Sequence, residues 1–397
     1  MRKIIFILLI LLLTQITVAQ TVQQCATETT LDTLDDNLRF FFTMPLYVGD
    51  RYPHWALWYA DSTGLHDTTM SWADAWFFIS PSGQQLLVAN VSEHFVMTPR
   101  QGGRRDYGGV YLDRLELIDT RTLERRTLNL PEAFYQRRYR ISQWLDEEHI
   151  MFTSIWDGIE TVTVDIVNER IVDTHLWHTE DLALWYHQGG TALVSPNGEY
   201  LFYTTDEIVY HIADIYIAEG IPWSVSGLTW RVVDRDGNVV LDYIEGTYGH
   251  FFSTQWFPDS SAILLHALDY PSASLRIDLE GKVATFYPER LSQVAFGPKS
   301  HIAFTSRVGE FITLLILDTE TGELVDYCQQ DSISAGSWSA DERYLPYTLL
   351  GDNSSDIRIL DIVNNTYVSI MPYPVESDAD ASIYIWLIGW GYVEDGS

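Results

Sequence analysis

The residues of this chain best suited to bind a ligand lie in a short stretch rich in arginine. Residues 100–140 contain ten arginines and six acidic residues, whereas the whole chain has 24 basic and 55 acidic residues and a formal charge of −31. A guanidinium group can bind a carboxylate or a phosphate through two parallel hydrogen bonds. The stretch is therefore predicted either to bind an anionic group or an acidic partner, or to form a solvated edge that offsets the acidic remainder of the chain.

Two segments, residues 89–113 and 204–230, contain the candidate binding residues. The first segment contributes His94, Arg100, Arg104, Arg105 and Tyr107. The second contributes Tyr210, His211 and Trp223. Aromatic side chains line grooves that hold saccharides or peptides. They also pack loops onto the elements beneath them, and both interpretations remain open.

The backbone of the second segment can be interpreted in two ways. Thr204 and Glu207 have the spacing of a helical capping box, and Gly220 would end such a helix. The run from Asp214 to Ile217 alternates like a strand instead. We expect a short helix, with a strand as the alternative.

The sequence contains none of the common motifs for hydrolysis or metal binding. It lacks the Gly-x-Ser-x-Gly elbow, the His-Glu-x-x-His helix motif and the aspartate box of sialidases. His175, His178 and His187 lack the spacing that would place their rings around one metal. Asp234 begins a calcium-like loop, but the later ligand positions are missing and a hairpin turn explains it. We therefore predict no catalytic residue, no metal site and no cofactor.

Six copies of a nine-residue pattern recur along the chain. Each has Leu or Ile at its seventh position and ends in a large apolar residue, after a start that is usually a polar turn. This arrangement is typical of a tight turn that leads into a buried strand. The copies are Ser80–Val88, Trp144–Phe152, Ser195–Tyr203, Phe257–Leu265, Phe296–Phe304 and Ser339–Tyr347.

A second pattern follows each copy: an apolar strand that ends in aspartate, a polar turn and another strand. Its aspartates are Asp119, Asp165, Asp234, Asp278, Asp318 and Asp361, and an unpaired copy contains Asp61. In four repeats this aspartate lies 21 or 22 residues after the start of the first pattern, and in the other two it lies 39 residues after it. The two longer repeats therefore carry insertions at one equivalent place, between their second and third strands. Insertions that cluster in one type of loop indicate a functional face.

Four-stranded repeats with this spacing predict an all-β protein with the architecture of a β-propeller, formed by residues 38–393 as one domain. Three strands between Phe40 and the hairpin at Asp61 would be completed by a C-terminal strand, Ile383–Ile388. The two ends of the chain would then share one blade and close the ring. This gives seven four-stranded blades, with six or eight as alternatives. A two-sheet sandwich is the competing fold, but it does not predict equal offsets between the two patterns.

The Ser-Pro-Asn-Gly type of turn, as at Ser195, followed by an Asp-x-x-Thr-Gly hairpin, as at Asp318, resembles the repeat of TolB-type propellers, which are relatives of the WD-repeat class. The resemblance covers about residues 54–392 and implies a scaffold that binds proteins or saccharides. TolB-type proteins also carry an α/β domain, and no segment between Gln20 and His54 fits one. The resemblance therefore does not support a role for this chain in a transport complex.

The N-terminus has the pattern of a secretory signal peptide. Arg2 and Lys3 precede an apolar run, and small residues follow it before Gln20. Residues 1–19 are therefore predicted to be removed, which leaves residues 20–37 as an N-terminal segment of a secreted, periplasmic or cell-surface protein. The alternative is a retained anchor, and only then would a membrane be a partner. Cys25 and Cys328 could pair in an oxidising compartment or remain two separate thiols.

The overall charge narrows the possible partners. A charge of −31 repels a phosphate backbone, so we expect no nucleic-acid partner. We predict an exported, acidic and non-enzymatic propeller that holds a protein or saccharide ligand on the face with both insertions. The alternatives are a propeller glycosidase or polysaccharide lyase, with acidic or histidine side chains at the central channel, and a structural component of an assembly.

Overall fold

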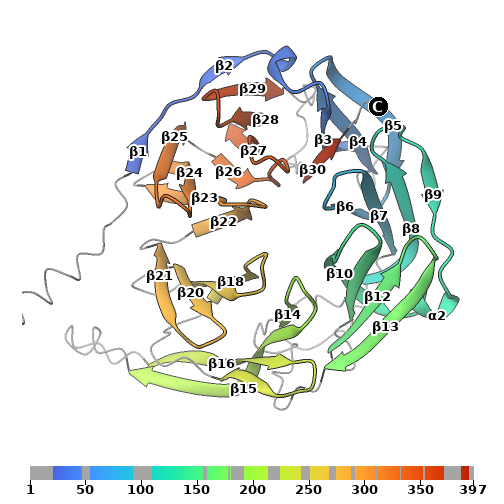
Figure 1. The fold of residues 1–397 in the computed structure, drawn as a ribbon, viewed down its shortest axis with the longest axis vertical. Helices are drawn as coiled ribbons and strands as arrows, with labels where there is room; N and C mark the ends of the chain where they lie inside the picture. Colours follow the sequence, from blue (N-terminus) through green and yellow to red (C-terminus); the bar gives the residue numbers. More distant parts are fainter. Residues whose placement is uncertain are drawn as a thin grey trace, which may run out of the picture.

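The computed structural model is a ring of blades around a central opening (Figure 1). The structure describes residues 21–46, 54–92, 110–154, 159–177, 179, 192–212, 224–242, 251–267, 274–287, 291–308, 311–330, 332–351, 354–370 and 386–392. The strands in these ranges form seven four-stranded blades, which we number in chain order. The predicted all-β propeller with seven blades is confirmed.

Six blades are built from consecutive antiparallel strands. Blade 2 consists of β6 (Ala75–Ile79), β7 (Gln85–Ser92), β8 (Val110–Asp119) and β9 (Arg125–Thr127). Blade 3 consists of β10 (Arg138–Trp144), β11 (His149–Ser154), β12 (Ile159–Asp165) and β13 (Arg170–Trp177). Blade 4 consists of β14 (Ala192–Val194), β15 (Tyr200–Ile212), β16 (Ser224–Asp234) and β17 (Val239–Asp242).

The remaining consecutive blades follow the same order. Blade 5 consists of β18 (Phe251–Trp256), β19 (Ala262–Ala267), β20 (Ser274–Asp278) and β21 (Val283–Tyr287). Blade 6 consists of β22 (Leu291–Phe296), β23 (His301–Val308), β24 (Phe311–Asp318) and β25 (Leu324–Gln330). Blade 7 consists of β26 (Ser332–Ala335), β27 (Tyr344–Gly351), β28 (Ser354–Asp361) and β29 (Thr366–Ile370).

Blade 1 joins the two ends of the chain and closes the ring. The C-terminal strand β30 (Trp386–Tyr392) lies antiparallel to β3 (Leu38–Leu46), which continues into β4 (His54–Asp61) and β5 (Gly64–Trp72). The predicted sharing of one blade is confirmed, although β30 lies later in the chain than the segment expected. Figure 1 shows the first strand of each consecutive blade, and β30 in blade 1, facing the centre.

The N-terminal segment runs along the outside of two blades. β1 (Thr21–Gln23) lies parallel to β25, and β2 (Thr27–Thr29) lies parallel to β29. Figure 1 shows both strands at the rim of the ring, after which the 3-10 turn η1 (Leu31–Thr33) leads to blade 1. Cys25, between β1 and β2, is disulfide-bonded, and Cys328 is the only other cysteine of the sequence. The proposed signal segment, residues 1–19, lies outside the described residues.

The hydrophobic core lies between neighbouring blades. Phe41 and Leu86 belong to the cluster between blades 1 and 2, and Phe202 and Ile263 to the cluster between blades 4 and 5. Each blade is buried on both faces, so its central strands consist of almost continuous apolar runs. The short helix α2 (Glu132–Tyr135) adds Phe134 to the core between blades 2 and 3. No helix in the described ranges is long and apolar enough to cross a membrane.

The repeated aspartates stabilise the second hairpin of each blade. At every one, a side-chain oxygen accepts a hydrogen bond of 2.7–3.0 Å from a backbone N–H two to four residues later. Such side-chain contacts replace a backbone turn and explain why aspartate recurs there. The residues are Asp61, Asp119, Asp165, Asp234, Asp278, Asp318 and Asp361. Asp234 thus belongs to a hairpin turn, as predicted.

In blades 3 and 6, the turn between the first and second strands is one residue shorter than the sequence pattern suggests. The backbone N–H of Ser80 reaches the carbonyl five residues later, and Ser195 does the same. Leu145 and Gly297 instead reach the carbonyl four residues later. The inner strands of blades 3 and 6 therefore extend to the first residue of the sequence pattern, and their turns begin one residue later.

Candidate functional site

The alternating strand directions give the ring two different faces. The turns that join first to second strands and third to fourth strands lie on one face, which we call the turn face. The connections from second to third strands and from blade to blade lie on the other, the loop face. Both predicted insertions join second to third strands, β7 to β8 and β15 to β16. Both therefore begin and end on the loop face.

Most of the predicted binding residues lie outside the described part of the chain. The residues concerned are His94, Arg100, Arg104, Arg105, Tyr107 and Trp223. Tyr210 and His211 lie in β15, opposite Ser226 and Val225 of β16. The structure therefore places the backbone of these two residues and leaves the others as predictions. His175 lies in β13 against the ring of Trp177, whereas His178 and His187 are not described.

The second insertion continues the blade as a long ribbon. β15 and β16 pair from Tyr200 and Asp234 to Ile212 and Ser224, with one irregularity between Thr204 and Ile208. Their neighbours β14 and β17 have three and four residues, so the paired ribbon extends past them at the loop face. The expected short helix is wrong for this part of the segment. β-branched residues at 208, 209 and 212 favour the paired strand over the capping-box signal.

In the described part of the basic stretch, four arginines form ion pairs with carboxylates of blades 2 and 3. Their pairs are Arg114–Glu116, Arg125–Glu116, Arg126–Glu169 and Arg137–Glu160. Glu116 is 2% exposed and also accepts a hydrogen bond of 2.8 Å from the indole of Trp72. This part of the stretch forms a blade edge that offsets neighbouring acids, which was one of the two predicted interpretations.

An axial channel of about 810 Å³ passes between the inner strands of blades 3 to 7 and blade 1. Polar groups on its wall include Thr254, Gln255 and Ser337, and apolar groups include Leu193 and Phe296. Every described wall residue is uncharged. The volume falls in the range of about 300–1,000 Å³ that is usual for ligand pockets. A wall of this kind can hold a ligand by apolar contact and a few neutral hydrogen bonds.

Four tryptophans link the inner strands across blade junctions. Each indole N–H donates to a backbone carbonyl of the preceding blade, at 3.0–3.2 Å. The pairs are Trp144 to Phe78, Trp256 to Leu193, Trp338 to Ala295 and Trp390 to Ser337. Buried indoles need such a partner. We did not predict these contacts, although a tryptophan at or next to the start of three repeat copies is visible in the sequence.

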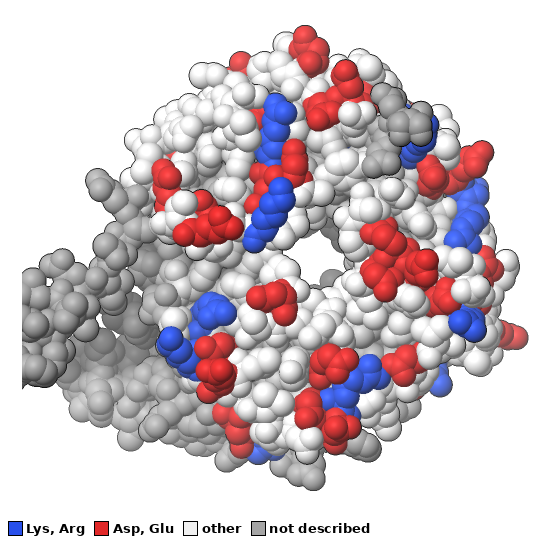
Figure 2. All heavy atoms as spheres, in the orientation of Figure 1, with Lys and Arg blue, Asp and Glu red and all other residues white. Residues whose placement is uncertain are grey.

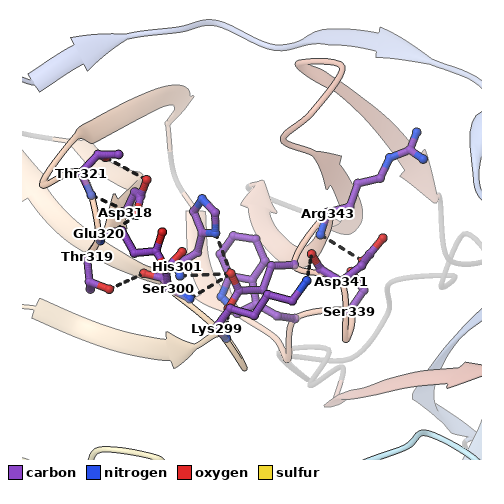
Figure 3. Close-up of polar contacts among 12 residues, drawn as sticks. Lys299, Ser300, His301, Asp318, Thr319, Glu320, Thr321, Ser339, Asp341 and Arg343 are labelled. Carbon is purple, nitrogen blue, oxygen red and sulfur yellow. Dashed lines mark hydrogen bonds and ion pairs between the residues drawn. The ribbon is translucent and has the colours of Figure 1, made fainter.

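A buried carboxylate joins the turns of blades 6 and 7. Glu342 is 3% exposed and accepts hydrogen bonds from the backbone N–H groups of Lys299, Ser300 and His301. The His301 ring contributes a further contact of 2.7 Å from Nδ1, and Figure 3 shows these donors side by side. Burial raises the pKa of Glu342, but the bonds from His301 and the amides outweigh it, so that the pKa is lowered overall.

The residue at the same turn position also contacts the preceding blade at two other junctions. The carboxylate of Glu147 in blade 3 accepts hydrogen bonds from the N–H and hydroxyl of Ser82 in blade 2, at 2.5 and 2.6 Å. Ser260 in blade 5 accepts a hydrogen bond of 3.0 Å from the N–H of Asn197 in blade 4. These contacts stabilise the scaffold. Among the described residues, no group of three or more His, Cys, Asp or Glu side chains could hold a metal ion.

Comparison with known proteins identifies the fold and not a family. Neither models of protein families nor curated sequences match the chain. Solved structures do match. The β-propeller domain of the Trilobed protease from Pyrococcus furiosus is 12% identical, with a TM-score of 0.53, over 89% of this chain and 100% of that one. That domain is described as having an open velcro topology, whereas β30 pairs with β3 in this chain.

Two further structures extend the comparison. Pyrococcus horikoshii acylaminoacyl peptidase is 11% identical, with a TM-score of 0.52, over 89% of this chain and 54% of that one. TolB from Acinetobacter baumannii is 12% identical, with a TM-score of 0.41, over 89% of this chain and 82% of that one. At these identities the likeness concerns the fold alone. The expected TolB-like β-propeller is confirmed at that level.

Proposed function

We propose that this chain is an exported, non-enzymatic binding scaffold that holds a protein or saccharide ligand on its loop face, at the mouth of the axial channel. The observation that carries the proposal is the channel itself. Its volume of about 810 Å³ suits a ligand, and its wall combines neutral amide and hydroxyl groups with aromatic and aliphatic surface. Sugar hydroxyls and peptide groups are neutral hydrogen-bonding partners that match such a wall.

The position of the insertions supports the loop face as the place of entry. The strands that flank both insertions end on this face, and the β15–β16 ribbon extends past its neighbours there. Longer connections on one rim of a rigid ring can adapt to a ligand while the blades hold them in place. The undescribed arginines of the first insertion are proposed to contact an anionic group of the ligand.

Export is supported by two independent features. The N-terminal pattern is that of a signal peptide, with basic residues before an apolar run. Cys25 is disulfide-bonded, and disulfides persist mainly in oxidising compartments outside the cytoplasm. A test is to express the full chain with a C-terminal tag and to sequence the N-terminus of the exported product. A mature protein that begins near Gln20 supports the proposal, and an intact N-terminus in the cytoplasm contradicts it.

Ligand binding can be tested with a glycan array and a peptide array probed in parallel. Wild type is compared with Gln255→Trp, which fills part of the channel, and with a triple alanine variant of Arg100, Arg104 and Arg105. Glu320→Ala serves as a control, because Glu320 is exposed in a hairpin turn on the opposite face. We expect hits that are lost in Gln255→Trp and kept in the control. Identical binding profiles for all four proteins would reject the loop face and channel as the site.

A further inference from the structure

A second cavity lies on the turn face, at the other end of the axis from the insertions. Its volume is about 210 Å³, and its walls include Pro81, Pro298, Trp338, Trp390 and Tyr392. The prolines belong to the first hairpin turns of blades 2 and 6, and Trp390 and Tyr392 belong to β30. The cavity shares Pro258, Phe296 and Ser337 with the channel wall and opens among the turns, on the face opposite to the insertions.

The size of the cavity limits what it can hold. A volume of 210 Å³ is below the range of about 300–1,000 Å³ that is usual for pockets of whole small molecules. It corresponds to about seven water molecules at their share of liquid volume, about 30 Å³ each. One large side chain of a partner therefore fits this space better than a complete ligand does.

The walls of the cavity select for an aromatic side chain. The indole N–H groups of Trp338 and Trp390 are already bound to the carbonyls of Ala295 and Ser337, so these residues offer the cavity apolar ring surface. The Tyr392 hydroxyl accepts a hydrogen bond of 2.6 Å from the N–H of Ala340. Prolines and aromatic rings form favourable offset or edge contacts with a further ring.

Exposed carboxylates surround this cavity. Asp259 and Asp341 are exposed, and each directly follows a residue of the wall, Pro258 and Ala340. Basic residues lie beside both carboxylates. The ammonium group of Lys299 donates to the carbonyl of Asp341, Arg343 interacts electrostatically with Asp341, and Arg276 does so with Asp259. Figure 2 shows acidic side chains beside the central opening of the ring, with basic side chains near some of them. Exposed carboxylates at the rim attract positively charged groups and raise the rate of their association.

We propose that the turn-face cavity docks one aromatic side chain from a basic segment of a partner protein, with the lysines or arginines of that segment beside Asp259 and Asp341. The aromatic ring supplies the anchor in a desolvated pocket, and the basic flanks supply charge complementarity. This site lies on the face opposite to the proposed ligand site, so the scaffold can connect its loop-face ligand to a second protein.

The proposal can be tested by fluorescence anisotropy with a labelled heptapeptide, Gly-Lys-Lys-Trp-Lys-Lys-Gly. We expect saturable binding that weakens with added salt. Replacing the peptide tryptophan by alanine should weaken binding by about tenfold or more. The protein variant Ala340→Trp, which fills the cavity, should weaken binding to a similar extent, whereas Gln255→Trp in the channel should not. No saturable binding, or equal binding of the alanine peptide, overturns the proposal.

The charged rim can be tested without disturbing the turns. In blade 4, Asn197 occupies the turn position that Asp341 has in blade 7. Its side-chain oxygen accepts the equivalent hydrogen bonds, from the hydroxyl of Ser195 and the N–H of Glu199. Asp259→Asn with Asp341→Asn should therefore keep the fold and lower affinity about threefold or more at low salt. Asp278→Asn removes one charge from an outer hairpin and should leave affinity unchanged. Equal affinity of the double variant and this control overturns the proposed role of the rim.

Discussion

Replacing Glu342 by alanine should lower the free energy of unfolding by about 3–5 kcal/mol. This is the usual cost of removing one partner of a buried ion pair. The carboxylate is 3% exposed and accepts hydrogen bonds from three backbone N–H groups and the ring of His301. Without it, those amides of blade 6 lose their acceptor in a part of the junction that water reaches poorly.

The backbone at this position allows a second, sharper comparison. Glu342 has φ of 62°, and glycines occupy the equivalent positions at Gly83 and Gly198 with φ of 74° and 73°. A residue with a Cβ atom costs about 1–2 kcal/mol in this region. Glu342→Gly should therefore be more stable than Glu342→Ala by about 1 kcal/mol, although both lack the carboxylate.

Thermal unfolding measured by calorimetry can resolve these differences. With an unfolding entropy of about 2.1 cal/mol/K per residue, a chain of this length shifts its Tm by about 1.2 °C per kcal/mol. Glu342→Ala should then unfold about 4–6 °C below wild type. Glu320→Ala, an exposed neighbour on the same face, serves as the control. A Glu342→Ala protein that unfolds within 1 °C of wild type, or a glycine variant less stable than the alanine variant, would refute the reasoning.

The same carboxylate predicts a dependence on pH. Hydrogen bonds outweigh burial and hold the pKa of Glu342 below its ordinary value of 4.5. Its contribution to stability is therefore fully present above about pH 4.5 and is lost as the pH falls through the lowered pKa of the folded state. The Tm difference between wild type and Glu342→Ala should shrink between pH 6 and pH 3. A difference that stays constant over this range would contradict the assignment.

Three further changes test other contacts of the ring. Trp256→Phe removes the indole bond to Leu193 and should cost about 1–2 kcal/mol of unfolding free energy, measured by urea denaturation. Gly83→Ala should lower the free energy of unfolding by about 2–4 kcal/mol, because a Cβ atom there would lie 2.6 Å from the Tyr392 ring. Gly322 has the same φ of 74° but open space around it, so Gly322→Ala should lower the free energy of unfolding by only about 1 kcal/mol. Cys25→Ser should lower stability by about 2–5 kcal/mol and remove the response to reductant, which wild type should show.

The blades were predictable because each repeats one local solution. An aspartate at the end of the third strand satisfies backbone N–H groups of its own turn, so the requirement is visible within four residues of sequence. The equal offsets between patterns then identified the second and third strands and the insertions between them. Closure of the ring followed from counting strands, since three strands near the N-terminus needed a fourth.

The features that escaped prediction depend on residues distant in sequence. β1 and β2 have three residues each, too few for a periodic pattern, and the edges of β25 and β29 determine their conformation. Thr204 and Glu207 have the spacing of a helix start, but pairing with β16 outweighs this local preference. The described channel wall is likewise assembled from six blades, each of which contributes between one and four neutral residues without a motif of its own.

The contacts between blades show an alternation that the repeat pattern conceals. The junctions between blades 2 and 3, 4 and 5, and 6 and 7 each have an indole hydrogen bond and a side chain that caps the preceding turn. Within the described ranges, the junctions between blades 1 and 2, 3 and 4, and 5 and 6 lack this inner-strand pair of contacts. Blades 1 and 2 are linked instead by the Trp72 indole to Glu116, and blades 3 and 4 by the Gln143 amide to the carbonyl of Ser195. Blade 1 is joined to blade 7 through Trp390. The junction between blades 5 and 6 therefore differs from its neighbours in the kind of contact that holds it.

This alternation predicts where the ring opens first. Aromatic contacts join blades 5 and 6, from Phe257, Phe286 and Tyr287 of blade 5 to a cluster that includes Phe304. Apolar contacts without directional bonds resist sliding and separation less than a junction that also has buried hydrogen bonds.

Local opening needs less free energy at the junction between blades 5 and 6, and exchange of backbone amides reports such opening. Hydrogen exchange measured by mass spectrometry can follow this opening in the two inner strands beside the junction, β18, which Trp256 fixes to blade 4, and β22, which Trp338 fixes to blade 7. Trp256→Phe should raise exchange in β18 above that of β22, which keeps its bond from Trp338. Unchanged exchange of β18 in this variant would show that the hydrogen bonds do not set the order of opening.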